Sequence, residues 1–243
     1  MGILAFGINH KSASVDLRGR ISFAPEIVVQ VLQDARSILH VQEVALLSTC
    51  NRTEVYLFGE TTDVQLLTWL SMIKGVEIGQ LQDCYYCHRD EQAITHMMRV
   101  ASGLDSLILG EPQIFGQIKS AYSVGREAGT VSTFLNQAFQ QAFSAAKRVR
   151  SETAIGKNPV SVAYASVNLA AQIFTNLKDA HALLIGAGET IDLVAKHLCD
   201  QQIGKITVAN RTLSRAQELA EVYSADAILL ADIPDFLPHA DII

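Results

Sequence analysis

The stretch Ala-Leu-Leu-Ile-Gly-Ala-Gly-Glu-Thr, residues 182–190, decides the fold class of this chain. Ala182–Ile185 is an apolar run of strand length, and the glycines after it separate it from a helical pattern at Thr190–Leu198. The further expected elements are a strand at Ile206–Ala209, a helix at Leu213–Tyr223 and a strand at Ala227–Leu230. Such strand and helix alternation is typical of a parallel, doubly wound sheet.

The same stretch predicts a nucleotide site, because glycines let the backbone approach a pyrophosphate at a helix N-terminus. The third glycine of the usual fingerprint is absent, since Ile191 holds its place. Arg211 follows the second strand, where an acidic residue would suit NAD and an arginine suits a 2′-phosphate. We therefore expect NADPH. An ordinary strand-to-helix turn and a solvated arginine are the alternatives. The expected cofactor-binding residues are Gly186, Ala187, Gly188, Glu189, Thr190, Ile191, Asn210, Arg211 and Thr212.

Upstream of this region the pattern is mixed. Strands are expected at Leu4–Ile8, Val44–Ser48 and Val55–Phe58, and helices at Pro25–Leu39, Glu91–Val100, Gln113–Glu127, Leu135–Arg150 and Ser161–Phe174. The sequence Gly-Lys-Asn-Pro at 156–159 indicates a boundary. The predicted fold class is α/β, with a mixed α+β catalytic domain at residues 1–155 and a Rossmann-like NADP-binding domain at residues 156–243. Because 156–243 is too short for six strands, we expect that domain to be truncated.

Composition narrows the class of protein. The 243 residues are 49% hydrophobic and 18% charged, and the net charge of −6 disfavours a DNA-coating protein while leaving room for a local RNA-binding patch. No apolar run reaches the length of a membrane span, and no secretion signal opens the chain. Four cysteines without such a signal are expected to be reduced thiols. We expect a cytoplasmic protein that binds neither membrane nor DNA.

Residues 46–54, Leu-Leu-Ser-Thr-Cys-Asn-Arg-Thr-Glu, are the most informative stretch for chemistry. A thiol is strongly nucleophilic only as the thiolate, and the Arg52 guanidinium could favour that form at Cys50 or hold a substrate carboxylate by two hydrogen bonds. Thr49, Asn51 and Thr53 supply polar groups for orientation. Taken alone, the pattern favours a buried structural cysteine at a strand end, because free cysteines are commonly buried.

This stretch resembles the signature of the glutamyl-tRNA reductases. So do Gly-Ile-Asn-His-Lys at 7–11, the block from Ala101 to Ile114, the run from Ala146 to Thr153, and the stretch 186–190. The blocks occur in family order across nearly the whole chain. The resemblance implies that Cys50 attacks the aminoacyl ester of glutamyl-tRNA(Glu) to form a glutamyl thioester. NADPH then reduces the thioester to glutamate-1-semialdehyde, the precursor of 5-aminolevulinate and tetrapyrroles.

The resemblance also implies site residues and partners. His96 is expected to be catalytic, by proton transfer or by polarising a carbonyl; a core histidine on an amphipathic helix is the alternative. A C-terminal helical dimerisation domain is expected beyond residue 243, with a homodimer for the full-length protein and glutamate-1-semialdehyde aminomutase as a possible partner. The expected substrate-binding residues are Thr49, Cys50, Asn51, Arg52, Ser106, Glu111, Pro112, Gln113 and Gln117.

Other interpretations remain open at this point. Cys-Tyr-Tyr-Cys-His at 84–88 matches the short pattern for covalent haem attachment, but that chemistry belongs to exported proteins. No second ligand pair accompanies this cluster, so no metal is expected. The rival enzyme is another NADP-dependent dehydrogenase, similar to shikimate dehydrogenase. The rival without catalysis is a nucleotide-sensing or haem-binding regulatory module.

Overall fold

The computed structural model describes residues 2–156 and 162–243. The chain divides into two compact units, Met1–Pro159 and Val160–Ile243. The expected boundary at 156–159 falls mostly outside the described residues. Within the part of the chain that the structure describes, no helix is both long enough and apolar enough to cross a membrane.

The first unit is built on an antiparallel sheet with the strand order β2-β3-β1-β4. Its strands are β1 (Gly2–Asn9), β2 (Glu43–Ser48), β3 (Arg52–Gly59) and β4 (Tyr85–Arg89). Gly7 in the central strand β1 lies between Glu54 on β3 and Tyr86 on β4. Since side chains alternate between the two faces of a strand, these three positions face the same side of the sheet.

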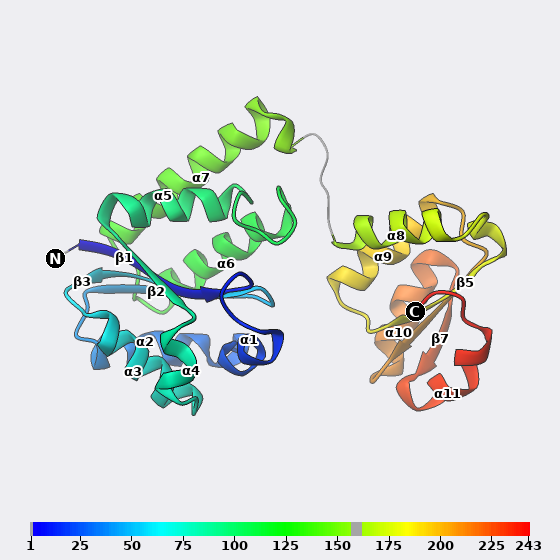
Figure 1. The fold of residues 1–243 in the computed structure, drawn as a ribbon, viewed down its shortest axis with the longest axis horizontal. Helices are drawn as coiled ribbons and strands as arrows, with labels where there is room; N and C mark the ends of the chain where they lie inside the picture. The colour runs from blue at the N-terminus through cyan, green and yellow to red at the C-terminus, as the bar shows by residue number, and fades with distance from the viewer. Residues whose placement is uncertain (1, 157–161) are drawn as a thin grey trace. The chain divides into compact units, whose positions relative to one another are not determined.

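Helices cover both faces of this sheet (Figure 1). One face packs on α1 (Val15–Ile21), α2 (Val28–Ile38), α3 (Asp63–Lys74) and α4 (Ile78–Gln82), through a core that includes Phe6, Val55 and Leu57. The other face packs on α5 (Asp90–Ala101), α6 (Gln113–Glu127) and α7 (Phe134–Glu152), through a core that includes Tyr56 and Phe139. The sheet is therefore buried on both sides, with a separate core on each.

The second unit has a parallel sheet in the order β5-β6-β7. Its strands are β5 (His181–Ile185), β6 (Lys205–Asn210) and β7 (Asp226–Leu229), and its helices are α8 (Val162–Ile173), α9 (Glu189–Asp200), α10 (Leu213–Tyr223) and α11 (Ile233–Phe236). Near the end of the chain, Ile242 forms a parallel bridge to Ala182. This arrangement confirms the expected α/β fold with a partial Rossmann-like sheet.

Several elements differ from the sequence prediction. The expected helix at Pro25–Leu39 begins with a 3-10 turn at Pro25–Ile27. Further 3-10 turns lie at Ala154–Gly156, Leu177–Asp179, Leu230–Asp232 and Leu237–His239. Helices α1, α3, α4 and α11 and strand β4 were not predicted. Strand β4 has no apolar run to reveal it, because its residues are Tyr-Tyr-Cys-His-Arg. It is a strand because its backbone pairs with β1.

Candidate active site

Cys50 lies at the tip of the turn that joins β2 to β3. The Thr49 amide donates to the Arg52 carbonyl at 2.8 Å, and the Thr49 hydroxyl accepts from the amides of Asn51 and Arg52, each at 3.2 Å. The turn therefore satisfies its own backbone and leaves Cys50 exposed to solvent. A buried structural cysteine, the alternative that the sequence alone favoured, is wrong for this position.

Neighbouring segments hold this turn in place. The His10 amide donates to the Asn51 carbonyl at 2.9 Å. Arg18 on α1 donates from Nε to the Cys50 carbonyl at 3.3 Å. The Ser48 hydroxyl accepts from the Phe23 amide at 2.8 Å. The backbone that carries the thiol is thus fixed from several directions, while the thiol itself stays accessible.

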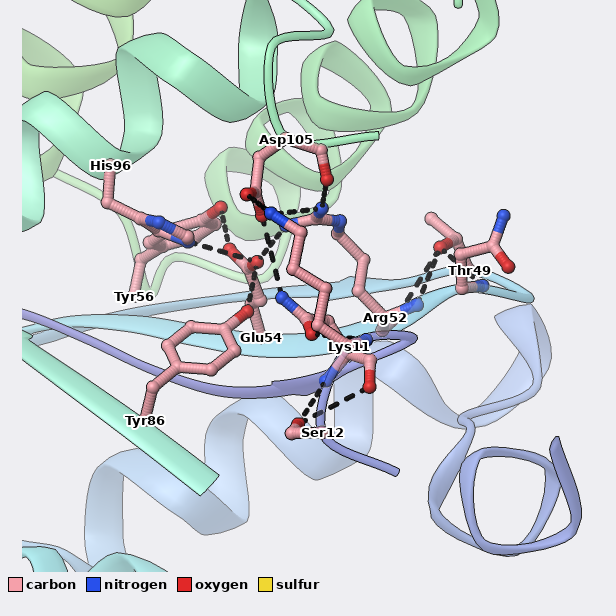
Figure 2. Close-up of polar contacts among 11 residues, drawn as sticks. Lys11, Ser12, Thr49, Arg52, Glu54, Tyr56, Tyr86, His96 and Asp105 are labelled. Carbon is pink, nitrogen blue, oxygen red and sulfur yellow. Dashed lines mark hydrogen bonds and ion pairs between the residues drawn. The ribbon is translucent and has the colours of Figure 1, made fainter. Parts of the chain in front are cut away.

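Directly after this turn, β3 carries a buried ionic cluster, which we call the Glu54 cluster (Figure 2). Its members are Lys11, Arg52, Glu54, Tyr56, Tyr86, His96 and Asp105. Arg52, Glu54 and Tyr56 alternate along β3, so they share the sheet face that α5 and α6 cover. The Glu54 carboxylate is fully buried. It accepts from Arg52, Tyr56 and Tyr86 and lies 3.1 Å from His96 Nε2.

Arg52 is the second centre of the cluster. Its Nη1 donates to Glu54, and its Nη2 donates to the Asp105 carboxylate at 3.0 Å and to the Asp105 carbonyl. The guanidinium side chain is only 1% exposed. Lys11, with a side chain 58% exposed, pairs with the same Asp105 carboxylate from the solvent side. The structure therefore does not show the free guanidinium that the sequence predicted as a carboxylate clamp, because both of its terminal nitrogens already have internal acceptors.

The charges within the cluster stabilise one another. Burial by itself would raise the pKa of Glu54, but His96 and Arg52 hold that pKa well below its usual range. Burial together with the Glu54 carboxylate raises the pKa of both Tyr56 and Tyr86, so the two phenols stay protonated and donate to Glu54. The cluster thus fixes a buried carboxylate and a buried guanidinium on β3, whose first residue, Arg52, closes the turn that carries the exposed thiol.

Tyr86 reaches Glu54 only because Gly7 has no side chain. The two residues flank Gly7 on neighbouring strands, so the phenol must pass over β1 to reach the carboxylate. A Cβ atom on Gly7 would lie 2.7 Å from the Tyr86 hydroxyl and 2.7 Å from Glu54 Cγ, closer than atoms can approach. The glycine is therefore a space requirement of the cluster.

The remaining predicted substrate residues lie in and after the loop between α5 and α6. This loop is closed by a hydrogen bond of 2.9 Å from the Gly110 amide to the Gly103 carbonyl, and Arg150 on α7 donates to three of its carbonyls. The loop supplies Asp105 to Arg52, and Ser106, which is half-buried, is the next residue along it. Burial raises the pKa of Glu111, an effect that the charge of Arg52 opposes. Pro112 and Gln117 are exposed, and Gln113 is half-buried.

The sequence analysis did not assign Lys11, Glu54, Tyr56, Tyr86 or Asp105 to the site. One signal was present: Arg-Thr-Glu-Val-Tyr at 52–56 places polar groups at every second position of a strand that is otherwise apolar. Alternate polar residues on a buried strand indicate a polar cluster within the core. The partners from β1, β4 and the loop had no comparable signal.

In the second unit, the glycine turn joins strand β5 to helix α9. Gly186 adopts φ +115°, a conformation that favours glycine, and its amide donates to the Ala209 carbonyl at 2.7 Å. Gly188 caps the N-terminus of α9, and the space beside its Cα is open. Glu189 and Thr190 in the first turn of α9 are exposed, and Ile191 is half-buried. These features fit a nucleotide whose phosphates approach the backbone closely.

The second expected part of that site follows β6. Arg211 and Thr212 are exposed in the turn between β6 and α10, and the Asn210 amide group donates to the Thr212 carbonyl at 3.0 Å. Because β5 and β6 are parallel neighbours, Arg211 and the glycine turn lie at the same edge of the sheet. An arginine there is free to meet a phosphate.

The Cys-Tyr-Tyr-Cys-His pattern forms part of a strand. Cys87 lies on β4, and burial and a hydrogen bond to Asp63 raise the pKa of its thiol to about 12. Cys84 lies just before the strand and is half-buried against the core that includes Phe6. Among the described residues, no group of three or more His, Cys, Asp or Glu side chains is arranged to hold a metal ion.

Comparison with known proteins agrees with this geometry in both units. The model of the family "Glutamyl-tRNAGlu reductase, N-terminal domain" matches residues 6–153, and that of "Shikimate / quinate 5-dehydrogenase" matches residues 168–243. The chain is 56% identical over 244 residues to a glutamyl-tRNA reductase of Stutzerimonas stutzeri, covering 100% of this chain and 58% of that protein. A glutamyl-tRNA reductase of Saccharophagus degradans is 56% identical over 243 residues, covering 100% and 57%.

A solved structure gives the same result. The glutamyl-tRNA reductase from Methanopyrus kandleri matches with a TM-score of 0.62 and 33% identity, over 98% of this chain and 57% of that one. The chain thus spans somewhat more than half the length of the relatives it matches. On the family match over residues 6–153, which is more than half of its length, the chain belongs to the glutamyl-tRNA reductase family.

Proposed function

We propose that this chain carries the acyl-transfer site and part of the cofactor site of an NADPH-dependent glutamyl-tRNA reductase, which makes glutamate-1-semialdehyde for tetrapyrrole synthesis. The observation that carries the proposal is the exposed Cys50 thiol on a fixed turn, directly followed in the chain by the Glu54 cluster. An accessible thiol on a fixed turn is the kind of nucleophile that covalent catalysis uses, and the charged groups of the Glu54 cluster follow it on the same strand. Family membership supports the identity of the substrate.

In the first step, the Cys50 thiolate attacks the ester carbonyl that joins glutamate to the tRNA. The new carbon–sulfur bond replaces the carbon–oxygen bond, and the tRNA leaves with its ribose hydroxyl restored. The ribose oxygen needs a proton as it leaves. We assign His96 to supply this proton, because its imidazole contacts the Glu54 carboxylate. The product on the enzyme is a glutamyl thioester, which is more electrophilic than the ester.

Recognition of the glutamyl group is assigned to residues on both sides of the turn. The aminoacyl group carries one free carboxylate and one ammonium. We propose that the carboxylate takes the place of Asp105 on Arg52 Nη2, an exchange that keeps the buried guanidinium paired. We assign Glu111 to the ammonium, because it is a partly buried carboxyl close enough to Arg52 to feel the charge of that guanidinium. The proposed substrate contacts are Thr49, Cys50, Asn51, Arg52, Ser106, Glu111, Pro112, Gln113 and Gln117.

The second step is the reduction of the thioester. NADPH, when bound at the glycine turn, supplies the hydride. The protein residues proposed to hold it are 186–191 with Asn210, Arg211 and Thr212. After reduction, the carbon–sulfur bond breaks, the Cys50 thiolate is restored and the aldehyde is released. One hydride and one proton are consumed in each cycle, and the proton is the one given to the tRNA oxygen.

From the family we further propose a homodimer for the full-length protein, transfer of the aldehyde to glutamate-1-semialdehyde aminomutase, and a cytoplasmic location. These proposals rest on the resemblance to the family and not on a contact within this chain. The tests are measurements of oligomeric state, of aldehyde transfer and of location in the cell, made on this chain and on a full-length relative such as that of Stutzerimonas stutzeri.

The central test is acylation of Cys50 without NADPH. Radiolabelled glutamyl-tRNA is incubated with the wild-type chain and with Cys50→Ser, followed by a rapid quench. We expect label on the wild-type protein that hydroxylamine releases, and little or none on Cys50→Ser, because a hydroxyl is a poor nucleophile at neutral pH. Cys84→Ser, Cys87→Ser and Cys199→Ser are matched controls that should keep the label. Label that persists in Cys50→Ser but is lost in one of these controls would refute the assignment.

The cofactor assignment is tested at Arg211. Replacing it with aspartate removes the proposed partner of the 2′-phosphate, so binding of NADPH relative to NADH should fall about tenfold or more. Arg215→Asp, which makes the same charge change four residues later on the exposed side of α10, is the control. Both dissociation constants are measured by fluorescence titration. Equal losses in the two variants would show a general charge effect and contradict the assignment of Arg211.

A further inference from the structure

A second histidine packs against His96. His88 on β4 and His96 on α5 have ring centroids 4.8 Å apart with an angle of 34° between the rings. Tyr86 lies beside both, with centroids 5.5 Å from His88 and 5.2 Å from His96. Tyr86 and His88 are two positions apart on β4, so both rings rise on the sheet face that α5 covers. The three rings form one aromatic contact next to Glu54.

The two imidazoles have different surroundings. His96 Nε2 lies 3.1 Å from the Glu54 carboxylate, whereas the neighbour of His88 on β1 is Ala5, which carries no polar group. The charged or titratable groups that face His88 are His96 from α5, Glu54 from β3, Asp105 from the following loop, and Tyr86 from its own strand. Burial and the charge of His96 lower the pKa of His88 more than Glu54 and Asp105 raise it.

Two imidazolium rings in such contact would repel each other, so the pair holds one proton more readily than two. His96 is the ring that touches a carboxylate, and Glu54 would balance a positive charge on it. A neutral His88 then offers the face of its ring to the His96 imidazolium, and this contact keeps the edge of His96 on Glu54. With Nε2 directed at Glu54, His96 Nδ1 is the nitrogen left to give a proton.

We propose that His88 is a positioning residue of the acyl-transfer site, a neutral ring that fixes the orientation of His96 and leaves the shared proton on it. The proposal rests on the proposed function, in which the His96 proton passes to the departing ribose oxygen as the sulfur–carbon bond forms. His96 then takes a new proton from water. His88 neither gives nor receives a proton in the cycle, and its own protonation in acid places a second positive charge against His96 and slows acylation.

Two variants separate the ring of His88 from its titration. His88→Phe keeps a flat ring and cannot be protonated, whereas His88→Gln removes the ring. The rate of Cys50 acylation by labelled glutamyl-tRNA is measured from about pH 5 to about pH 8, the range in which imidazoles titrate. At neutral pH, we expect the acylation rate of His88→Phe to lie within about threefold of the wild-type rate. In acid, the rate of His88→Phe should begin to fall at a pH about half a unit or more below that of wild type. His88→Gln should lose about tenfold at every pH, because His96 is no longer held.

Tyr85→Phe is the matched control, since Tyr85 lies on the same strand but stacks on Phe6 at the opposite face of the sheet. Its pH profile should match that of wild type. A His88→Phe profile that also matches wild type would overturn the proposal, as would an unimpaired His88→Gln.

An independent measurement needs no turnover. Nuclear magnetic resonance of the ring-labelled wild-type chain reports the order in which the two histidines take up protons as the pH falls. The proposal requires His96 to be protonated before His88, and the reverse order would overturn it. If the wild-type chain never acquires label on Cys50, the proposed function fails instead, and the order of protonation still decides whether His88 is the neutral member of the pair.

Discussion

The two faces of the sheet in the first unit are buried by different means. Along β3, Val55 and Leu57 point into a core of mainly apolar side chains, whereas Arg52, Glu54 and Tyr56, which alternate with them, enter the opposite face as part of an ionic cluster. The apolar face is stabilised by burial that depends little on direction. The polar face requires every charge and donor to meet its partner, because a buried charge without one is costly.

This difference indicates where selection for function has acted. Buried ion pairs are often no more stabilising than apolar residues of the same size, so stability alone does not explain a cluster of this kind. The Glu54 cluster lies at the Cys50 end of the sheet, since Arg52 ends the turn that carries the thiol. Buried groups whose pKa values are strongly shifted are common at functional sites. The apolar face supports the fold, and the polar face supports the proposed chemistry.

The largest effect should come from removing the central charge. Glu54→Gln leaves Arg52 with Asp105 alone, and breaking such a buried pair costs about 3–5 kcal/mol of unfolding free energy. On the apolar face, Leu57→Met keeps the volume and should cost less than about 1.5 kcal/mol. Urea unfolding followed by fluorescence of Trp69, which lies in the core of the first unit, measures both. Equal costs would show that the two faces are stabilised alike.

The same two variants can be compared by measuring how their unfolding free energies depend on pH. The pKa of Glu54 is lowered in the folded protein, so its contribution is present above the ordinary carboxyl pKa of 4.5 and is lost as the pH falls below it. The unfolding free energy of wild type and of Leu57→Met should fall steeply below about pH 4.5. That of Glu54→Gln should fall less steeply. Parallel curves for all three proteins would contradict a dominant role of Glu54.

A smaller effect is expected from one donor to the cluster. Tyr86→Phe deletes the hydroxyl that donates to Glu54, and loss of a hydrogen bond to a charged acceptor costs about 1.5–3 kcal/mol. Tyr85→Phe changes the neighbouring residue, which faces the apolar core, and should cost less. Thermal unfolding of the two variants gives the comparison. A larger cost for Tyr85→Phe would reverse the assignment of the two faces.

The smallest effect is expected from filling the space beside Gly7 on β1, which Tyr86 and Glu54 occupy. Gly7→Ala should cost about 1–3 kcal/mol, because the new methyl group meets both Tyr86 and Glu54 and these must shift. Gly19→Ala is the control: it lies on α1, where nothing stands within 4 Å of the added carbon, and alanine favours a helix. It should be neutral or stabilising. If Gly7→Ala is also neutral, the phenol does not need that gap.

Much of this molecule was predictable from local sequence. The alternation of strands and helices after residue 180, the glycine turn and the position of Arg211 all depend on neighbours within a few residues, and turn chemistry and hydrophobic period record these directly. The same holds for the turn at Cys50, which Thr49 closes with its own side chain. Even the alternate polar residues of β3 were visible as a pattern.

The partners within the cluster were decided only by the tertiary structure. Arg52 meets Asp105 across 53 positions of the chain, Glu54 meets His96 across 42, and Tyr86 reaches Glu54 across 32. No local period records such pairs, since they arise when β1 and β4 pair and α5 packs on the sheet. For that reason the sequence indicated that Arg52 serves the thiolate or a substrate carboxylate, and it gave no sign of the internal partners Glu54 and Asp105. A charge on a strand determines that a partner must exist, and only the fold determines which residue that partner is.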